Sequence, residues 1–441
     1  MFAYYLDLAL RSLKRSKALT ALMIVTIGFG VAASMTTWSV FRAVSGDPIP
    51  QKSAELFVPQ IDNWGPTGHA PGSHSTEPPN AMDYTDAVAL MRAHRAKYQS
   101  AMYQIADSVM PKHLNQPPTM VAGEAVSSEF FPMLNVPFEY GAGWSATDDT
   151  NRARVVVLSN KLNQTLFGGR DSVGQVLTFG RHDFRVVGVT RDWHPQPVFY
   201  DVVNTGGFSD MAGGIFMPFT TAIAVDQGVN GTMNCQKPPA ESGFKGVQQS
   251  ECVWISMMVQ LDSAAVVRDY HQFLVNYAAT QQQAGRFTWA PNVRLRGLMD
   301  WLDIQHVVPP DTRISLYVAL GLLLVCLVNV MGLLLAKFMR RSGEIGVRRA
   351  LGASRRQIYA QFLVEAGMVG LAGGALGLVL TGFGVAGVGW VMPKDIAALA
   401  HMNLSLLVTT VVVAIVATLL AGLYPTLRAA AVQPAWQLKS N

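Results

Sequence analysis

Four long apolar runs dominate the pattern of hydrophobic and polar positions: residues 18–41, 314–336, 366–392 and 404–427. About 20 apolar residues are enough for a helix to cross a bilayer, so each run predicts a transmembrane helix. The runs are unevenly spaced, because residues 42–313 separate the first from the second. The pattern therefore predicts one membrane anchor, a large domain outside the membrane, and three clustered spans.

Residues 1–17 precede the first apolar run and are weakly amphipathic. Phe2, Leu6, Leu10 and Leu13 recur at helical spacing, and basic residues follow them. This is typical of a helix lying at the membrane interface. A signal peptide is the rival interpretation, but its apolar core would be only about 7–15 residues long. The length of 18–41 favours a retained anchor.

Residues 42–313 mix the periods of strands and helices, which predicts an α+β domain. A shift to Gly, Ser, Pro, Asn and Gln at about 202–250 predicts an inserted lobe with long loops. The strand-like runs are 120–126, 154–159, 184–190, 215–219 and 253–261, and the helix-like runs are 80–98, 160–167 and 263–283.

Charge sets the predicted orientation. Only 14% of the 441 residues are charged and the net charge is +5, with the basic residues close to the apolar runs. The positive-inside rule then places residues 1–17, 337–365 and 428–441 in the cytoplasm and the short loop 393–403 outside. Both termini are predicted to be cytoplasmic. No zinc-finger spacing or stacking motif indicates nucleic-acid binding.

The segment 337–365 holds seven Lys and Arg residues. Gly352 resembles the end of one helix, since glycine enters the left-handed conformation freely. Ser354 with Gln357 resembles a capping box that opens the next helix. Arg355 and Arg356 would then lie where the helix dipole disfavours cations, which favours lipid phosphates or a partner's carboxylates as their role. The alternative is that they only keep the segment on the cytoplasmic side.

Two stretches resemble known families. The run EIGVRRALGASRRQIYAQFLVEA, from residue 344, resembles the FtsX-like permease domain. The runs VSSEFFPMLNVPFEYGAGWSATDD and ARVVVLSNKLNQTLFGGRDSVGQVLTFGRHDFRVVGVTRDW resemble the periplasmic core domain of MacB-like permeases. Residues 43–78 and 202–250 match least well, and Ala435 and Trp436 depart from the usual C-terminal pattern.

The resemblance implies a permease subunit of a MacB-like ABC transporter in the inner membrane, working in efflux as a dimer by mechanotransmission. The implied partners are a separate cytoplasmic ATPase subunit, membrane lipid and, in a Gram-negative cell, a periplasmic adaptor protein and an outer-membrane channel. Two other functions stay open: a regulator of a cell-wall hydrolase, and an antimicrobial-peptide sensor. The sensor group usually has ten spans, so four spans count against it.

The resemblance also places the contact with the ATPase in the 337–365 segment. On a helical wheel Ile345 lies between Arg348 and Arg349, opposite Val347 and Leu351, which predicts an exposed apolar knob that enters a partner's groove. The alternative is that Ile345 packs within its own subunit. The predicted coupling residues are Glu344, Ile345, Gly346, Arg348, Arg349, Gly352, Arg355 and Arg356.

The third span is rich in glycine. Gly370 with Gly374, and Gly373 with Gly377, are small-xxx-small pairs that allow close helix contact. They indicate packing within the subunit or, alternatively, a dimer seam, and we favour the first. Asn329 and Glu365 are polar positions in or near spans, for which bonds to neighbouring helices are favoured over a transport path.

Candidate chemistry is sparse. Cys235 and Cys252 share the predicted external lobe, where a disulfide would stabilise by about 3 kcal/mol in the chain-entropy model. Cys326 is predicted to be inert packing inside a span. His69, His74 and Glu77 fit no metal signature, so no metal site is predicted, and no cofactor or catalytic residue is indicated. These 441 residues contain no phosphate-binding loop motif, so ATP hydrolysis is expected from a separate subunit.

Overall fold

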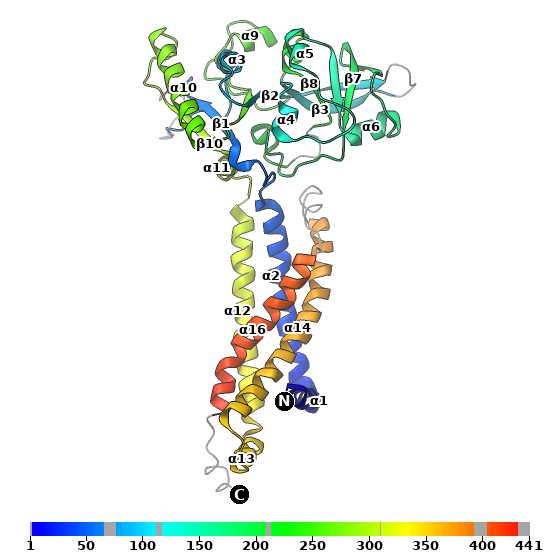
Figure 1. Cartoon of the computed structure of the whole chain (residues 1–441), viewed down its shortest axis with the longest axis vertical. Coiled ribbons are helices and arrows are strands. Elements are labelled where there is room, and N and C mark those ends of the chain that lie inside the picture. Colours follow the sequence, from blue (N-terminus) through cyan, green and yellow to red (C-terminus); the bar gives the residue numbers. More distant parts are fainter. Residues whose placement is uncertain are drawn as a thin grey trace. The chain divides into compact units, whose positions relative to one another are not determined.

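Two compact units divide the chain, one made of residues 1–46 and 308–441 and one of residues 47–307. They are called the helical unit and the sheet unit below. The computed structural model in Figure 1 describes residues 2–65, 76–111, 117–208, 213–308, 310–391 and 404–430. The predicted loop 393–403, the tail beyond residue 430, and His69 and His74 lie outside these ranges.

In the described part of the helical unit there are four long apolar helices and two shorter ones. Among the described residues, the four long helices are long and apolar enough to cross a membrane. Helix α14 begins at Arg355, so the second helix of the 337–365 segment and the third span form one continuous helix. The elements are α1 (Phe2–Arg15), α2 (Lys17–Ser45), α12 (Pro310–Met339), α13 (Ser342–Ala350), α14 (Arg355–Val391) and α16 (Leu404–Ala430).

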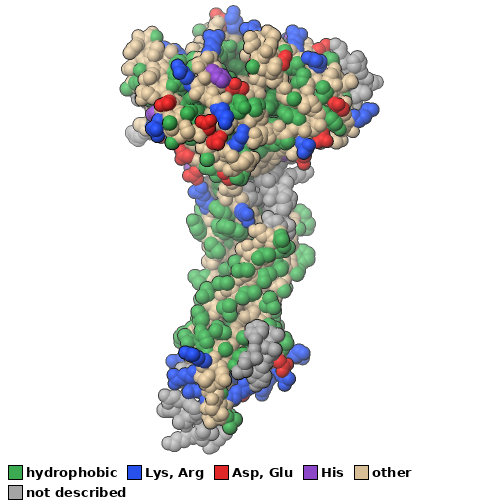
Figure 2. Space-filling model, in the orientation of Figure 1, with side chains coloured by type: hydrophobic (Ala, Val, Ile, Leu, Met, Phe, Trp, Pro, Cys, Tyr) green, Lys and Arg blue, Asp and Glu red, His purple; other side chains and the backbone are tan. Residues whose placement is uncertain are grey.

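Packing within the helical unit centres on α14, which contacts α1, α2 and α16, while α2 also contacts α12. The shared core includes Ile27 of α2, Val330 of α12 and Val369 of α14. Large apolar side chains on the other faces stay exposed, and Figure 2 shows them as a hydrophobic surface along the bundle. Helices satisfy their own backbone groups, so such a surface suits contact with lipid.

The glycines of α14 explain how closely these helices approach. A Cβ at Gly370 would lie 2.1 Å from Thr418 Oγ1 on α16, and one at Gly374 would lie 3.0 Å from Ala414 Cβ. A Cβ at Gly373 would lie 2.7 Å from Ile27 Cγ2 on α2, and one at Gly377 would lie 3.2 Å from Val31 Cγ1. Both small-xxx-small pairs therefore face neighbours in the same subunit.

The sheet unit is built on a ten-stranded mixed sheet. Nine strands follow the order β10-β1-β9-β2-β3-β8-β5-β7-β4, and β6 pairs with β2 and β7. Only the pairs β3–β8 and β5–β7 are parallel. The strands are β1 (Leu56–Ile61), β2 (Tyr98–Pro111), β3 (Thr119–Val126), β4 (Phe138–Gly141), β5 (Val155–Leu158), β6 (Val176–Phe179), β7 (His182–Thr190), β8 (Ile215–Pro218), β9 (Ser256–Gln260) and β10 (Val293–Gly297).

Two hydrophobic clusters fill the sheet unit. Alternate residues of one strand enter different clusters, as Val156 and Val157 of β5 do, because successive side chains of a strand point to opposite faces. Short helices cover both faces. They are a 3₁₀ turn (Ser53–Glu55), α3 (Tyr84–Ala93), α4 (Phe130–Leu134), α5 (Ala146–Thr150), α6 (Asn160–Phe167), α7 (Val202–Thr205), α8 (Phe219–Ala224), α9 (Phe244–Gln248), α10 (Ala264–Gln283) and α11 (Leu298–Ile304).

The stretch 202–250 is not the separate lobe that its composition predicts. Strand β8 lies within it and pairs with both β3 and β5, in the middle of the sheet. The loops after α8 are tied back to the sheet, since Asn234 forms a bridge with Val253 beside a disulfide between Cys235 and Cys252, whose sulfur atoms are 1.94 Å apart. The strand predicted at 215–219 is β8, so the error lies in assigning the whole stretch to a separate lobe.

Candidate functional site

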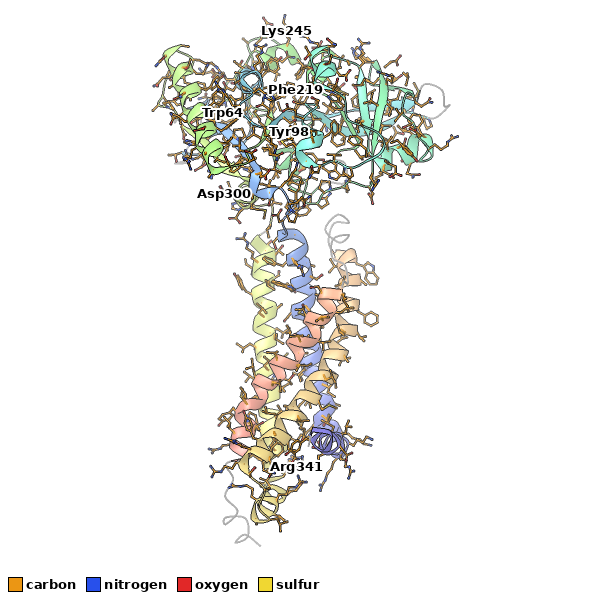
Figure 3. All side chains as sticks on the ribbon, viewed as in Figure 1. Trp64, Tyr98, Phe219, Lys245, Asp300 and Arg341 are labelled. Atoms are coloured by element: carbon orange, nitrogen blue, oxygen red, sulfur yellow. A yellow bond between two sulfur atoms is a disulfide. The ribbon has the colours of Figure 1, made fainter. Side chains whose placement is uncertain are left out.

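Five helices meet at one end of the helical unit, and we call this region the basic end. It is formed by α1, the start of α2, the end of α12, α13 and the start of α14. Figure 2 shows Lys and Arg side chains gathered there, and Arg341 is labelled there in Figure 3. It is the end that the sequence predicts to be cytoplasmic.

Glu365 of α14 is the centre of the basic end, with 0% of its side chain exposed. Its carboxylate lies 2.8 Å from Lys337 Nζ and 3.1 Å from an Arg341 nitrogen. Ser12 of α1 donates a third contact through its hydroxyl, at 2.5 Å. Burying a carboxylate without partners costs a large free energy, and these partners reduce that cost. Their contacts hold α1, α12 and α14 together around one charge.

Lys337 is the second buried ion, with 3% of its side chain exposed. Its ammonium also lies 3.4 Å from Thr20 Oγ1, which brings the start of α2 into the same network. The sequence signal for this pair is a charged residue directly next to the end of one apolar run and the start of the next. That signal favours a bond from Glu365 to a neighbouring helix but identifies neither Ser12 nor Thr20.

Helix α13 is attached to this network through Glu344. Its carboxylate pairs with Arg341 at 3.1 Å and with Arg348 at 2.7 Å, and Arg348 also donates to the Gln361 amide oxygen at 2.9 Å. Burial would raise the pKa of Glu344, but the hydrogen bonds and charge of Arg341, with Arg348 and Arg15 nearby, lower it below its ordinary value. The carboxylate therefore stays ionised at neutral pH.

The α13–α14 junction has the conformation that its residues predict. Gly352 has a φ of +99°, its N–H donates to the Arg349 carbonyl, and the next N–H donates to the Arg348 carbonyl. This is a Schellman motif, which satisfies the last carbonyls of a helix. Ser354 and Gln357 exchange side-chain-to-backbone hydrogen bonds of 2.9 and 3.3 Å, which is the predicted capping box.

The predicted exposure of Ile345 is wrong. Its side chain is only 3% exposed and belongs to the core of the helical unit, and Gly346 is buried beside it. The opposite face of α13 is the exposed one, with Val347 at 57% and Leu351 at 84%. The helical wheel gave the correct division of faces, but the Ile345 face is the one that packs on the bundle, where Arg341 and Arg348 bind Glu365 and Gln361 of α14.

The other predicted residues divide between exposed and buried positions. Arg355 and Arg356 are exposed at the start of α14, whereas Arg349 is half-buried. Asn329 is exposed on α12, so it faces away from the neighbouring helices of this subunit. Glu77 pairs with Arg296 and lies 3.7 Å from Arg294. Among the described residues, no three His, Cys, Asp or Glu side chains gather as a metal site.

Comparisons with known proteins match both halves of the chain. The family model described as the MacB-like periplasmic core domain matches residues 20–272, and the FtsX-like permease C-terminal model matches residues 316–434.

Individual proteins are similar to this chain over part of their own length. The macrolide export ATP-binding/permease protein MacB of Bordetella avium is 26% identical over 85% of this chain and 51% of its own length. The probable syringafactin export ATP-binding/permease protein of Pseudomonas syringae is 28% identical over 58% of this chain and 33% of its own. The periplasmic region of MacB from Actinobacillus actinomycetemcomitans covers 57% of this chain and 92% of its own, with 12% identity and a TM-score of 0.36. The chain thus spans about half or less of these full-length relatives.

Proposed function

This chain belongs to the family of MacB-like and FtsX-like ABC transporter permeases, and from that premise we propose that it works by mechanotransmission. ATP hydrolysis at the cytoplasmic side would move the helices, and the helices would move the extracytoplasmic α+β domain. A substrate on the periplasmic side would be extruded without passing between the four spans.

The observation that carries this proposal is the attachment of α13. Its buried face is fixed to the bundle by Ile345 and by the contacts of Arg341 and Arg348 with α14, while Val347 and Leu351 stay exposed outside the spans. Large apolar side chains on an exposed helix face favour a partner's groove over water. A push on α13 would pass through Arg341 to Glu365, and so to α14, α12 and α1.

The ATPase is proposed as the partner of α13. The 441 residues contain no G-x-x-x-x-G-K-[ST] motif, so the nucleotide would bind to a domain outside them, and we propose that this domain belongs to a separate subunit. Val347 and Leu351 would enter a groove of that subunit. Arg355 and Arg356, both exposed at the start of α14, would meet carboxylates at its rim.

A second copy of the chain is proposed along α12. Asn329 lies near the middle of this helix and is exposed, on the same stripe as Gly321 and Gly332, which have open space where a Cβ would be. A polar amide facing lipid is unfavourable, whereas an amide facing its symmetry mate can be hydrogen-bonded. A homodimer would place two such stripes together. A periplasmic adaptor and an outer-membrane channel complete the proposed assembly in a Gram-negative cell.

The test is retention of the ATPase by variants of the exposed α13 face. We expect Leu351→Ser to weaken ATPase binding by about 2 kcal/mol, a typical value for an anchor at the centre of an interface. Met339→Ser is the matched control, because Met339 is also exposed near this end but belongs to α12. Co-purification with the ATPase and export-dependent resistance in cells are the measurements.

Two outcomes would contradict the proposal. One is full ATPase retention by Leu351→Ser, and the other is an equal loss in Leu351→Ser and Met339→Ser. Both variants must first elute as monodisperse protein in detergent, so that a folding defect is not counted as a binding defect.

A further inference from the structure

The basic end contains a cleft of about 610 Å³ that the ATPase contact does not explain. It lies between α1, the start of α2, the end of α12 and α13. Leu8 and Leu19 form its apolar part, and Ser12 and Ser16 contribute hydroxyl groups. Its six basic side chains are Arg11, Arg15, Lys337, Arg340, Arg341 and Arg348.

Charge in the cleft is unbalanced. The carboxylates that pair with its lining are Glu344, Glu365 and Asp7, and Asp7 lies 2.6 Å from Arg11. Three carboxylates against six cations leave an excess of three positive charges. Lys337, Arg341 and Arg348 surround Glu344 and Glu365 and leave one excess charge there, and the other two are those of Arg15 and Arg340, which are both exposed. This excess favours binding of an anion on that side.

The depth of the cleft indicates which anion. The α2 span begins at Lys17 and the α12 span ends at Met339, so the lining residues lie on both sides of the two span boundaries. Lipid phosphates lie at this level of a bilayer, just outside the hydrocarbon. The apolar part beside the cations suits the first methylenes of an acyl chain. A soluble anion has no apolar part that could pack against Leu8 and Leu19.

We propose that this cleft holds the phosphodiester headgroup of an anionic membrane phospholipid. Arg15 and Arg340 bind the phosphate, from α1 and from the end of α12. The lipid thereby joins α1 to α12 and α13, next to the Glu365 network. Lipid bound there becomes part of the surface through which α13 transmits movement.

The test is lipid retention by the purified full-length chain, without any ATPase, in a neutral detergent. Native mass spectrometry compares bound phosphatidylglycerol with phosphatidylcholine of the same acyl chains. We expect preferential retention of phosphatidylglycerol, and a loss of about tenfold in the Arg15→Gln/Arg340→Gln double variant. Arg355→Gln/Arg356→Gln removes the same charge from the same end but outside the cleft, and should retain the lipid.

Three results would overturn the proposal. They are equal retention of the two lipids, an equal loss in the two double variants, and displacement of phosphatidylglycerol by millimolar inorganic phosphate. The last would mean that the cleft recognises a free phosphate rather than a lipid. Because the ATPase is absent, the result is independent of whether α13 contacts it.

Discussion

At the basic end, contacts of single residues determine which face of α13 is buried, and the hydrophobic period alone does not. The helical wheel of 344–351 separates Ile345 from Val347 and Leu351, but a wheel has no absolute orientation. The contacts of Arg341 with Glu365 and of Arg348 with Gln361 supply that orientation, and they depend on residues of another helix, α14. Capping is different, since Gly352, Ser354 and Gln357 act within a few positions, and sequence alone was enough to predict it.

Ile345→Asp is expected to prevent stable folding of the helical unit rather than to uncouple it. A buried apolar group would be replaced by a charge without a partner, which costs several kcal/mol. Val347→Asp, on the exposed face of the same helix, should leave the folded yield unchanged. Monodisperse yield in detergent and thermal unfolding would separate the two. Equal yields of the two variants would contradict the buried position of Ile345.

Glu365→Gln tests the buried network. The change removes the negative charge and leaves Lys337 buried beside Arg341, and breaking a buried ion pair on one side typically costs about 3–5 kcal/mol. The double variant Glu365→Gln/Lys337→Met should recover a large part of that loss, because it removes the second buried ion. Thermal unfolding in detergent is the measurement. A double variant no more stable than the single one would show that the two ions are not coupled.

Glu124 in β3 is expected to make the sheet unit less stable at high pH. It is completely buried, and burial, then the charge of Asp201 and a hydrogen bond with Asp201, raise its pKa well above its ordinary value. The negative charge of Asp201 is better stabilised, because its carboxylate accepts hydrogen bonds from Asn204 at 2.8 Å and from Ser256 at 3.0 Å. Glu124 is therefore the neutral acid of the pair.

The sign follows from the raised pKa. Glu124 binds its proton more tightly in the folded state, so its contribution to stability is full below the ordinary pKa of 4.5 and is lost as pH rises through the folded pKa. The Tm of the sheet unit should fall between pH 5 and pH 9, and Glu124→Gln should reduce this fall by a few degrees. Near-UV circular dichroism against temperature would measure it. An unchanged slope would contradict the prediction.

Among the helices and strands, the sequence predicted those whose apolar residues follow a clear helical or strand period. The five predicted strands correspond to β3, β5, β7, β8 and β9, and the three predicted helices to α3, α6 and α10. It missed β2, because buried polar residues such as Gln99, Ser100 and Gln104 interrupt the apolar pattern. The glycine pairs were recognised as packing faces, but only the structure shows that one pair faces α16 and the other α2.

Gly373→Val should destabilise the contact between α14 and α2. A Cβ there would lie 2.7 Å from Ile27 Cγ2 in the buried core, so the two helices would have to separate. Overpacking of this kind typically costs about 1–3 kcal/mol. Gly387→Val is the control, because it lies in the same helix with open space at its Cβ position. Thermal unfolding of both in detergent is the measurement, and equal Tm values would contradict the close contact.

For the whole molecule, the order of the four spans and the external domain was predictable from the apolar runs and the family resemblance. The partners were not, because they depend on surfaces whose exposure is set by folding. Leu351 and Asn329 illustrate this limit: the sequence did not show that Leu351 is exposed outside the spans, a bond to a neighbouring helix was favoured for Asn329, and both side chains are exposed.

The topology is tested by cysteine labelling in intact cells. A cysteine at Thr150, an exposed position of the sheet unit, should react with a membrane-impermeant maleimide. A cysteine at Leu351 should react only after permeabilisation, and it is a better site than the buried position 345. The native Cys235 and Cys252 are bonded to each other and so do not interfere. Reaction at both sites from outside would refute the orientation.

The hydrogen bond between Ser12 and Glu365 joins residues that are 353 positions apart in the sequence. It therefore connects α1, which is synthesised early, with α14, which is synthesised late. At about 5–20 residues per second, the ribosome needs roughly 20–70 s to cover that distance. In the proposed orientation, α1 would remain at the membrane surface until the sheet unit has been translocated. Lys337 and Arg341 emerge shortly before Glu365 and can neutralise it at once. Ser12 can bind Glu365 only after α14 has been synthesised. Docking of α1 would therefore follow insertion of the earlier spans.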